Sequence, residues 1–141
     1  NILNTKINIG DALDFKSEKK ADIVLIDAPC SGFGTIRKLP EIKYNRTSEN
    51  ILELVATQRK LLNKGASLVK SGGTMLYSTC SIEPEENFNN IKWFLSNNTE
   101  FFLDPADNYI ESNYCKDNCL QTFPHIHNID GAFAARLIKK I

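Results

Sequence analysis

The feature that most constrains the fold is a short apolar run at residues 23–26, Ile-Val-Leu-Ile, which is rich in β-branched side chains. A continuous run of this kind is typical of a strand that is buried on both faces. The sequence "DAPCSG" follows at once, so this strand carries a carboxylate, a proline and a thiol at its carboxyl end. Residues 74–79 form a second predicted strand, and "CSIEPEEN" follows it. The sequence therefore predicts two strands, each followed closely by a cysteine.

Helix signals separate and follow these strands. Residues 31–47 contain Gly32, Gly34 and Pro40 and are expected to form a long loop. Ser48 is predicted to cap a helix that the turn at residues 71–73 ends. Its apolar face consists of Ile51, Leu52, Val55, Leu61, Leu62 and Leu68. Pro84 suits the first turn of another helix, with Glu85 and Glu86 at its positive end.

Shorter strands are expected toward both ends of the chain. Residues 6–9 are predicted to form one, closed by Gly10 and Asp11, and residues 100–103 another. Residues 132–138 are a final strand, paired with either the Phe123 region or the strand at 74–79, while residues 104–130 are irregular. The order strand, helix, strand, helix predicts an α/β fold with a largely parallel sheet.

In such a sheet the site lies beyond the carboxyl ends of the strands, where Asp11, Asp27, Cys30 and Cys80 all fall. The strands before Cys30 and Cys80 would be neighbours through one right-handed crossover, which brings the thiols close together. This placement favours covalent chemistry over the alternative of two small core residues. Asp27 is either a ligand contact or a hydrogen-bond anchor for the following loop.

A second polar cluster contains Cys115, Cys119, His125 and His127. The cysteine spacing is permitted for zinc, but His-x-His is shorter than the usual structural pattern. We therefore favour a surface loop with incidental thiols over a zinc site, and we expect no metal.

The loop after "DAPCSG" is basic, with Arg37, Lys38, Lys43 and Arg46 around Tyr44. A charge run is usually solvated surface, but its place beside the predicted site makes contact with RNA phosphates a rival interpretation.

Composition narrows the class of protein. The 141 residues fit one domain, and 17 basic against 17 acidic side chains give no global attraction to nucleic acid. The sequence contains no apolar stretch near the ~20 residues of a membrane span, no recognisable signal peptide, and too few cysteines for a secreted disulfide scaffold. We expect a cytoplasmic protein without a membrane partner.

Three motifs then carry a resemblance that covers nearly the whole chain: "DAPCSG", "TQRKLLNKGASLVKSGGTMLYSTCSIEPEEN" and "DGAFAARLIKK". Together they resemble the RNA cytosine-5 methyltransferases, the family that includes the bacterial 16S ribosomal RNA methylases of the Sun/Fmu type. The family resemblance implies a Rossmann-like fold, S-adenosylmethionine as cofactor and RNA, expected to be 16S rRNA, as partner.

The resemblance also implies residue roles. Cys80 would attack cytosine C6, because the RNA group uses the Thr-Cys cysteine, and Cys30 would serve product release. Asp27 would bind the base near N3 or the methyl donor, and Asp11 would contact the adenine of the cofactor.

The sequence departs from the family at its start. The glycine-rich cofactor loop and the acidic residue for the ribose are absent, so residues 1–141 are expected to be the C-terminal part of the catalytic domain. The first strands and an N-terminal RNA-binding domain would be missing. The isolated chain is therefore expected to be inactive, and the alternatives are a catalytically inactive remnant and a zinc-stabilised binding module.

Overall fold

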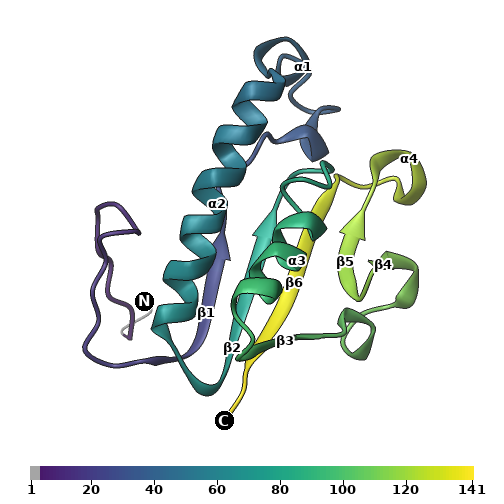
Figure 1. Ribbon diagram of the computed structural model, residues 1–141. Coiled ribbons are helices and arrows are strands. Elements are labelled where there is room, and N and C mark those ends of the chain that lie inside the picture. Colours follow the sequence, from purple (N-terminus) through teal and green to yellow (C-terminus); the bar gives the residue numbers. More distant parts are fainter. Residues whose placement is uncertain (1–3) are drawn as a thin grey trace.

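The computed structural model describes residues 4–141 and contains one mixed sheet with helices packed on it (Figure 1). The strands are β1 (Ala21–Asp27), β2 (Val69–Thr79), β3 (Phe101–Asp104), β4 (Cys115–Lys116), β5 (Cys119–Thr122) and β6 (Ala132–Lys139). The α-helices are α1 (Ile42–Asn45), α2 (Ser48–Leu68), α3 (Phe88–Asn97) and α4 (Pro124–His127). Three 3-10 turns lie at Phe33–Thr35, Ala106–Asn108 and Ser112–Tyr114.

The sheet is mixed, so the expectation of a largely parallel sheet is wrong. Its strand order is β1-β2-β6-β5-β4, and β3 pairs with the other end of β6. Only β1 and β2 are parallel among the strands of residues 4–141. The strand after α3 is only four residues long, and β6 inserts antiparallel between it and β2. Both pairings considered for the final strand occur, since β6 pairs with β2 and with β5, which ends just before Phe123.

Strand β1 forms one edge of the sheet. The prediction of a strand at residues 23–26 is confirmed, but its burial on both faces is wrong, because Ile23 is 63% and Leu25 66% exposed. Val24 and Ile26 point the other way and pack against the core. An edge position for this strand agrees with an α/β sheet whose first strands are missing from residues 4–141.

The strand expected at residues 6–9 does not form. Residues 5–9 have no regular secondary structure, and Ile7 and Ile9 are almost fully exposed. An isolated strand has no backbone partners, and no neighbour pairs with this segment within the described residues.

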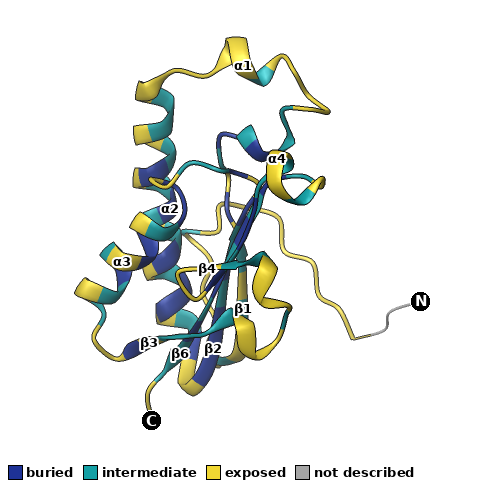
Figure 2. Ribbon diagram, turned by 90° about the vertical axis from the view of Figure 1, so that its right-hand side faces the viewer, coloured by how far each residue is buried: buried dark blue, intermediate teal, exposed yellow. Residues whose placement is uncertain are grey.

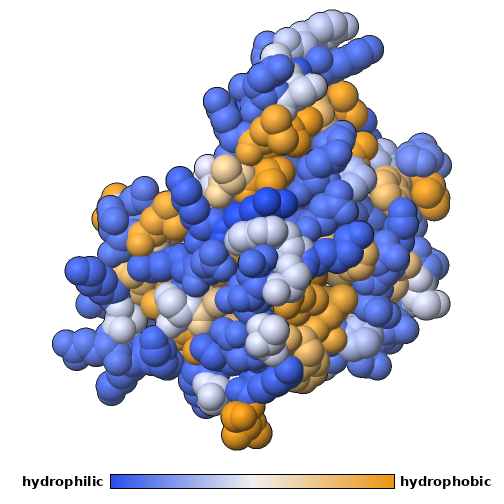
Figure 3. Space-filling view, viewed as in Figure 1, coloured by the Kyte–Doolittle hydropathy of each residue, from blue (hydrophilic) through white to orange (hydrophobic). Residues whose placement is uncertain are grey.

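Hydrophobic side chains on the face shown in Figure 3 gather in separate patches between hydrophilic ones.

Helices α2 and α3 cover one face of the sheet, and the buried layer lies between them and the strands (Figure 2). The core includes Leu62, Ala66, Met75, Tyr77, Ile91, Phe94, Phe101, Phe133, Ala135 and Leu137. Among residues 4–141, no helix combines the length and the apolar character that crossing a membrane requires.

The helix boundaries differ slightly from those predicted. Thr47, not Ser48, caps α2 and forms a reciprocal capping box with Asn50. Helix α2 ends at Leu68, and β2 begins at once at Val69, with Gly72 in the left-handed conformation near its start. Helix α3 begins at Phe88 rather than Pro84, because residues 84–87 form a separate turn. This turn directs Glu86 and Asn87 inward, toward the ends of β1 and β2.

Candidate active site

The structure brings the two predicted thiols together. Cys30 follows β1 and Cys80 follows β2, and the parallel register places Asp27 opposite Ser78. The two Sγ atoms are 3.2 Å apart, with Cys30 half-buried and Cys80 exposed. Neither thiol belongs to the hydrophobic core. The interpretation of this pair as small core residues is therefore excluded.

The two thiols differ in their surroundings. Burial raises the pKa of Cys30 to about 12, and the hydrogen bond to Cys80 and the charge of a Cys80 thiolate act in the same direction. Cys30 therefore keeps its proton at neutral pH and can donate its S–H to the Cys80 sulfur. Cys80, which is exposed, is the sulfur that an external reactant can reach.

A buried carboxylate is hydrogen-bonded to the residues that directly follow the two cysteines. Glu86 is 0% exposed, and its Oε1 accepts hydrogen bonds from the backbone N–H of Ser31 and from Gln58, at 2.8 and 2.9 Å. Its Oε2 accepts from the hydroxyls of Ser31 and Ser81, at 2.6 and 2.5 Å. We call Ser31, Gln58, Ser81 and Glu86 the Glu86 cluster. It joins the residue that follows Cys30 to the residue that follows Cys80.

Asn87 makes a second connection beside this cluster. Its Oδ1 accepts from the Thr79 hydroxyl at 2.6 Å, and its Nδ2 donates to the Ser81 carbonyl at 2.9 Å. Hydrogen bonds at the preceding residue, Thr79, and at the following residue, Ser81, therefore hold the backbone on either side of Cys80.

Sequence reasoning placed Glu86 at a helix end and missed this cluster. One signal was present at Gln58, which shares a helical face with the buried Val55 and Leu62. A polar side chain at such a position needs a buried partner.

Glycines allow three loops to meet at Cys80. The Gly34 N–H donates to the Cys80 carbonyl at 2.9 Å, and the Gly131 N–H donates to the Gly34 carbonyl at 2.8 Å. A Cβ on Gly34 would lie 2.0 Å from the Gly131 carbonyl oxygen and 2.7 Å from that of Cys80. Only glycine fits this crossing.

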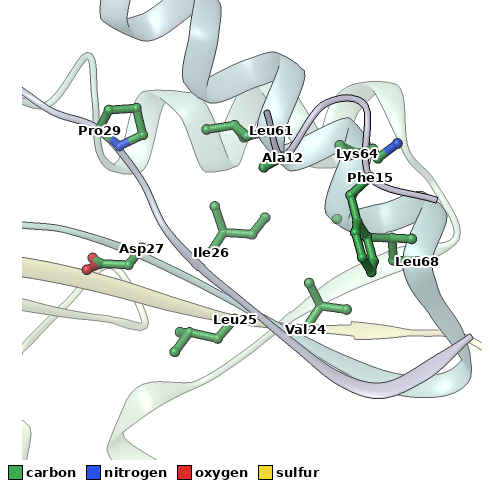
Figure 4. A pocket seen from close by; sticks show the side chains of 11 residues that line it. Ala12, Phe15, Val24, Leu25, Ile26, Asp27, Pro29, Leu61, Lys64 and Leu68 are labelled. Atoms are coloured by element: carbon green, nitrogen blue, oxygen red, sulfur yellow. The ribbon is translucent and has the colours of Figure 1, made fainter. Parts of the chain in front are cut away.

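Asp27 lies at the carboxyl end of β1, as predicted, and is exposed. Its Oδ1 accepts from the Ser78 hydroxyl at 3.0 Å. Asp27 and Pro29 lie at one end of a hollow of about 320 Å³ between β1, α2 and the turn at residues 12–15 (Figure 4). The other lining side chains are mainly apolar, including Ala12, Phe15, Val24, Leu25, Ile26, Leu61 and Leu68.

Asp11 does not follow a strand, which corrects its predicted placement. It lies in a turn where its Oδ1 accepts from the Leu13 N–H at 2.8 Å. Its neighbour Ala12 lines the same hollow as Asp27, whereas Asp11 itself lines an adjoining hollow with Gly10, Asp14 and Phe15.

The basic loop is tied to the rest of the site. Arg37 and Lys38 both form ion pairs with Asp130, at 2.7 and 2.5 Å, and hydrogen bonds from Lys38 and then Arg37 lower the pKa of Asp130. Arg46 donates to the Ser31 carbonyl at 3.2 Å, beside Cys30. Lys43 is exposed and lies over the ring of Tyr44.

Two of the four side chains considered for zinc, Cys119 and His127, make other contacts. Cys119 is fully buried in β5, and burial raises its pKa to about 12. The His127 ring bonds the backbone of Phe123 and Asn113. Nowhere in residues 4–141 do three or more His, Cys, Asp or Glu side chains converge as metal ligands would.

Comparison with known proteins assigns the family. Residues 1–138 match the family model described as 16S rRNA methyltransferase RsmB/F. Ribosomal RNA small subunit methyltransferase B of Shewanella oneidensis is 39% identical over 140 residues, which are 97% of this chain and 32% of that protein. A probable ribosomal RNA small subunit methyltransferase B of Bacillus subtilis is 37% identical over 126 residues, 84% of this chain and 28% of that protein.

Solved structures agree with this assignment. NSun6 from Pyrococcus horikoshii, crystallised with SFG, superposes with a TM-score of 0.82 at 30% identity, over 98% of this chain and 35% of that one. A methyltransferase homolog protein from the same organism gives a TM-score of 0.68 at 32% identity, over 86% of this chain and 40% of that one. The chain thus spans about a third of the length of these relatives. The chain has the fold of S-adenosylmethionine-dependent methyltransferases, and it belongs to the RsmB/F family of 16S rRNA methyltransferases.

Proposed function

We propose that residues 1–141 are the C-terminal part of a catalytic domain that methylates C5 of cytosine in 16S rRNA, with Cys80 as the covalent nucleophile. The observation that carries this proposal is the thiol pair, whose Sγ atoms are 3.2 Å apart and whose environments differ. Cytosine C5 is a poor nucleophile by itself, and covalent catalysis divides its methylation into easier steps.

In the first step the Cys80 thiolate adds to C6, and the electrons of the C5–C6 double bond move toward C5 and N3. S-adenosylmethionine, when bound, supplies the methyl group that C5 then takes up. Loss of the C5 proton restores the double bond and expels the Cys80 thiolate. The thiolate that adds is the thiolate that leaves, the methyl donor departs as S-adenosylhomocysteine, and a base takes the C5 proton.

The family resemblance assigns the release step to Cys30, whose Sγ lies 3.2 Å from that of Cys80. This short distance places Cys30 beside the adduct that Cys80 would form. Burial is the largest cause of the raised pKa of Cys30, so this thiol must give up its own proton before it can take the proton from C5.

The residues present fit part of the cofactor. The apolar hollow beside β1 offers a surface for an adenine ring, and the carboxylates of Asp11 and Asp27 are acceptors suited to its amino group or to the base. Asp27 would hydrogen-bond the base near N3, or bind the methyl donor. These roles for Asp11 and Asp27 follow the family resemblance.

RNA contact is proposed at Arg37, Lys38, Lys43 and Arg46, with Lys43 as the side chain most available to a phosphate. Further contacts are proposed in an N-terminal RNA-binding part. A cytoplasmic location, with rRNA as the substrate, belongs to the same proposal.

The test is identification of the product. The full-length protein, S-adenosylmethionine and undermethylated 16S rRNA are incubated, and the RNA is digested to nucleosides and analysed by mass spectrometry. We expect 5-methylcytidine to accumulate, and none with Cys80→Ala. A methyl group on another nucleoside or another cytosine atom would contradict the proposed chemistry.

A further inference from the structure

We propose that Glu86 is a positioning residue. Its carboxylate holds the Cys30 and Cys80 thiols at the separation and orientation at which both can act on the same cytosine base. The mechanistic part of this inference rests on the proposed function, while the structural part concerns the two thiols alone. Glu86 touches neither sulfur. It acts through Ser31 and Ser81, the residues that directly follow the two cysteines.

The bonding pattern of Glu86 is complete. Each carboxylate oxygen accepts two hydrogen bonds, so all four donors of the Glu86 cluster point at one group. An ionised carboxylate is acceptor-only, which is what four converging donors require. The two serine hydroxyls are also 3.1 Å from each other, so the ends of β1 and β2 meet at this carboxylate.

The orientation of Gln58 is fixed by a chain of bonds that reaches the surface. The Gln58 Oε1 accepts from Asn90, and the Asn90 Oδ1 accepts from Arg59. The Gln58 Nε2 must therefore face inward, where it donates to Glu86 and to the Pro29 carbonyl. Pro29 directly precedes Cys30, so the Cys30 segment is bonded on both sides, at Pro29 and at Ser31.

Burying a carboxylate at the position of Glu86 costs free energy of folding. Burial of a charge is unfavourable unless hydrogen bonds satisfy it, and an apolar side chain of similar volume would stabilise the fold at least as well. What an apolar side chain cannot do is to fix two loops, 50 residues apart in sequence, at a single set of distances. The arrangement therefore serves geometry at the thiols more than stability.

The thiol geometry can be measured without RNA or cofactor. In exchange with glutathione, the two thiols pass two electrons to oxidised glutathione and form a Cys30–Cys80 disulfide, while two reduced glutathiones are released. The equilibrium constant of this reaction is the effective concentration of one thiol at the other. It is measured in the full-length protein by quenching with acid and mapping the peptides by mass spectrometry.

We expect Glu86→Gln to lower this effective concentration by at least about tenfold, the factor that one hydrogen bond to a charged group is worth. The amide keeps the shape of the side chain but offers one acceptor oxygen in place of two. Glu85→Gln, on an exposed neighbour, should leave the constant unchanged. Leu137→Ala, which removes a buried core side chain remote from the cluster, should lower the melting temperature and leave the constant unchanged.

An unchanged constant in Glu86→Gln, or an equal fall in Leu137→Ala, would overturn the proposal. If Glu86→Gln does not fold, Ser81→Ala decides, because it removes one donor and leaves the carboxylate in place. In the methylation assay Glu86→Gln should lower kcat with little change in KM for RNA. If the effective concentration falls but no 5-methylcytidine is made even by the parent protein, the proposed function fails and the positioning role stands.

Discussion

Gly34→Ala tests the loop crossing that fixes the backbone of Cys80. The new Cβ would lie 2.0 Å from the Gly131 carbonyl oxygen, 2.6 Å from its carbon and 2.7 Å from the Cys80 carbonyl oxygen. All three neighbours are backbone atoms, so the loops themselves must separate. Overpacking costs about 1–3 kcal/mol, and the two backbone hydrogen bonds at the crossing contribute about 1 kcal/mol each. We expect a loss of about 3–5 kcal/mol, which is a large part of the ~5–15 kcal/mol of a typical domain.

The assay is urea unfolding followed by the fluorescence of Trp93, the only tryptophan of the chain. The loss corresponds to a fall in Tm of roughly 10–15 °C. Gly65→Ala is the matched control, because the atoms nearest its Cβ would belong to side chains and not to the backbone: Ile26 Cδ1 at 2.6 Å and Met75 Sδ at 2.8 Å. These side chains can shift more easily than backbone, and alanine is favoured over glycine in a helix by about 1 kcal/mol, so we expect a loss of about 0–2 kcal/mol. Equal losses in the two variants would refute the reasoning.

Three further predictions follow from the site. Iodoacetamide at pH 8 should label Cys80 before Cys30, because the pKa of Cys30 is raised to about 12 and its thiolate is scarce at any lower pH; peptide mapping that finds Cys30 labelled first would contradict this. Replacing Arg37, Lys38, Lys43 and Arg46 by alanine should weaken RNA binding and flatten its salt dependence by roughly one unit of log–log slope per lost phosphate contact, whereas an unchanged slope would make the loop ordinary surface. Residues 1–141 alone should bind S-adenosylmethionine negligibly in calorimetry, because no strand within residues 4–141 pairs with the outer edge of β1 and the sequence contains no glycine-rich loop. Micromolar binding would refute this expectation.

The elements that the sequence predicted well depend on local patterns. The runs at residues 23–26 and 74–79 and the apolar face of α2 are local signals, and each corresponds to an element of the structure. The closeness of Cys30 and Cys80 was predictable too, because it needs only two neighbouring parallel strands.

What the sequence did not reveal depends on contacts between distant segments. Glu86 lies two residues after Pro84, a spacing typical of a first helical turn, but in the structure it belongs to the turn before α3 and bonds Ser31 and Ser81. The pairing of Asp130 with Arg37 and Lys38 spans more than 90 residues. The antiparallel insertion of β6 has no local signal, since an alternating strand fits either direction.

Covalent trapping on RNA that contains 5-fluorocytosine tests the central claim most directly. Fluorine at C5 cannot leave as a proton does, so an enzyme that methylates this base stays bonded to it. In the full-length protein we predict that Cys80→Ala abolishes the protein–RNA adduct, and that Cys115→Ala, a control outside the site, leaves it unchanged. Cys30→Ala should still form the adduct, and on ordinary RNA it should accumulate one, because attack remains possible while release is slowed. Adducts that vanish with Cys30→Ala and persist with Cys80→Ala would reverse the two roles and contradict the account.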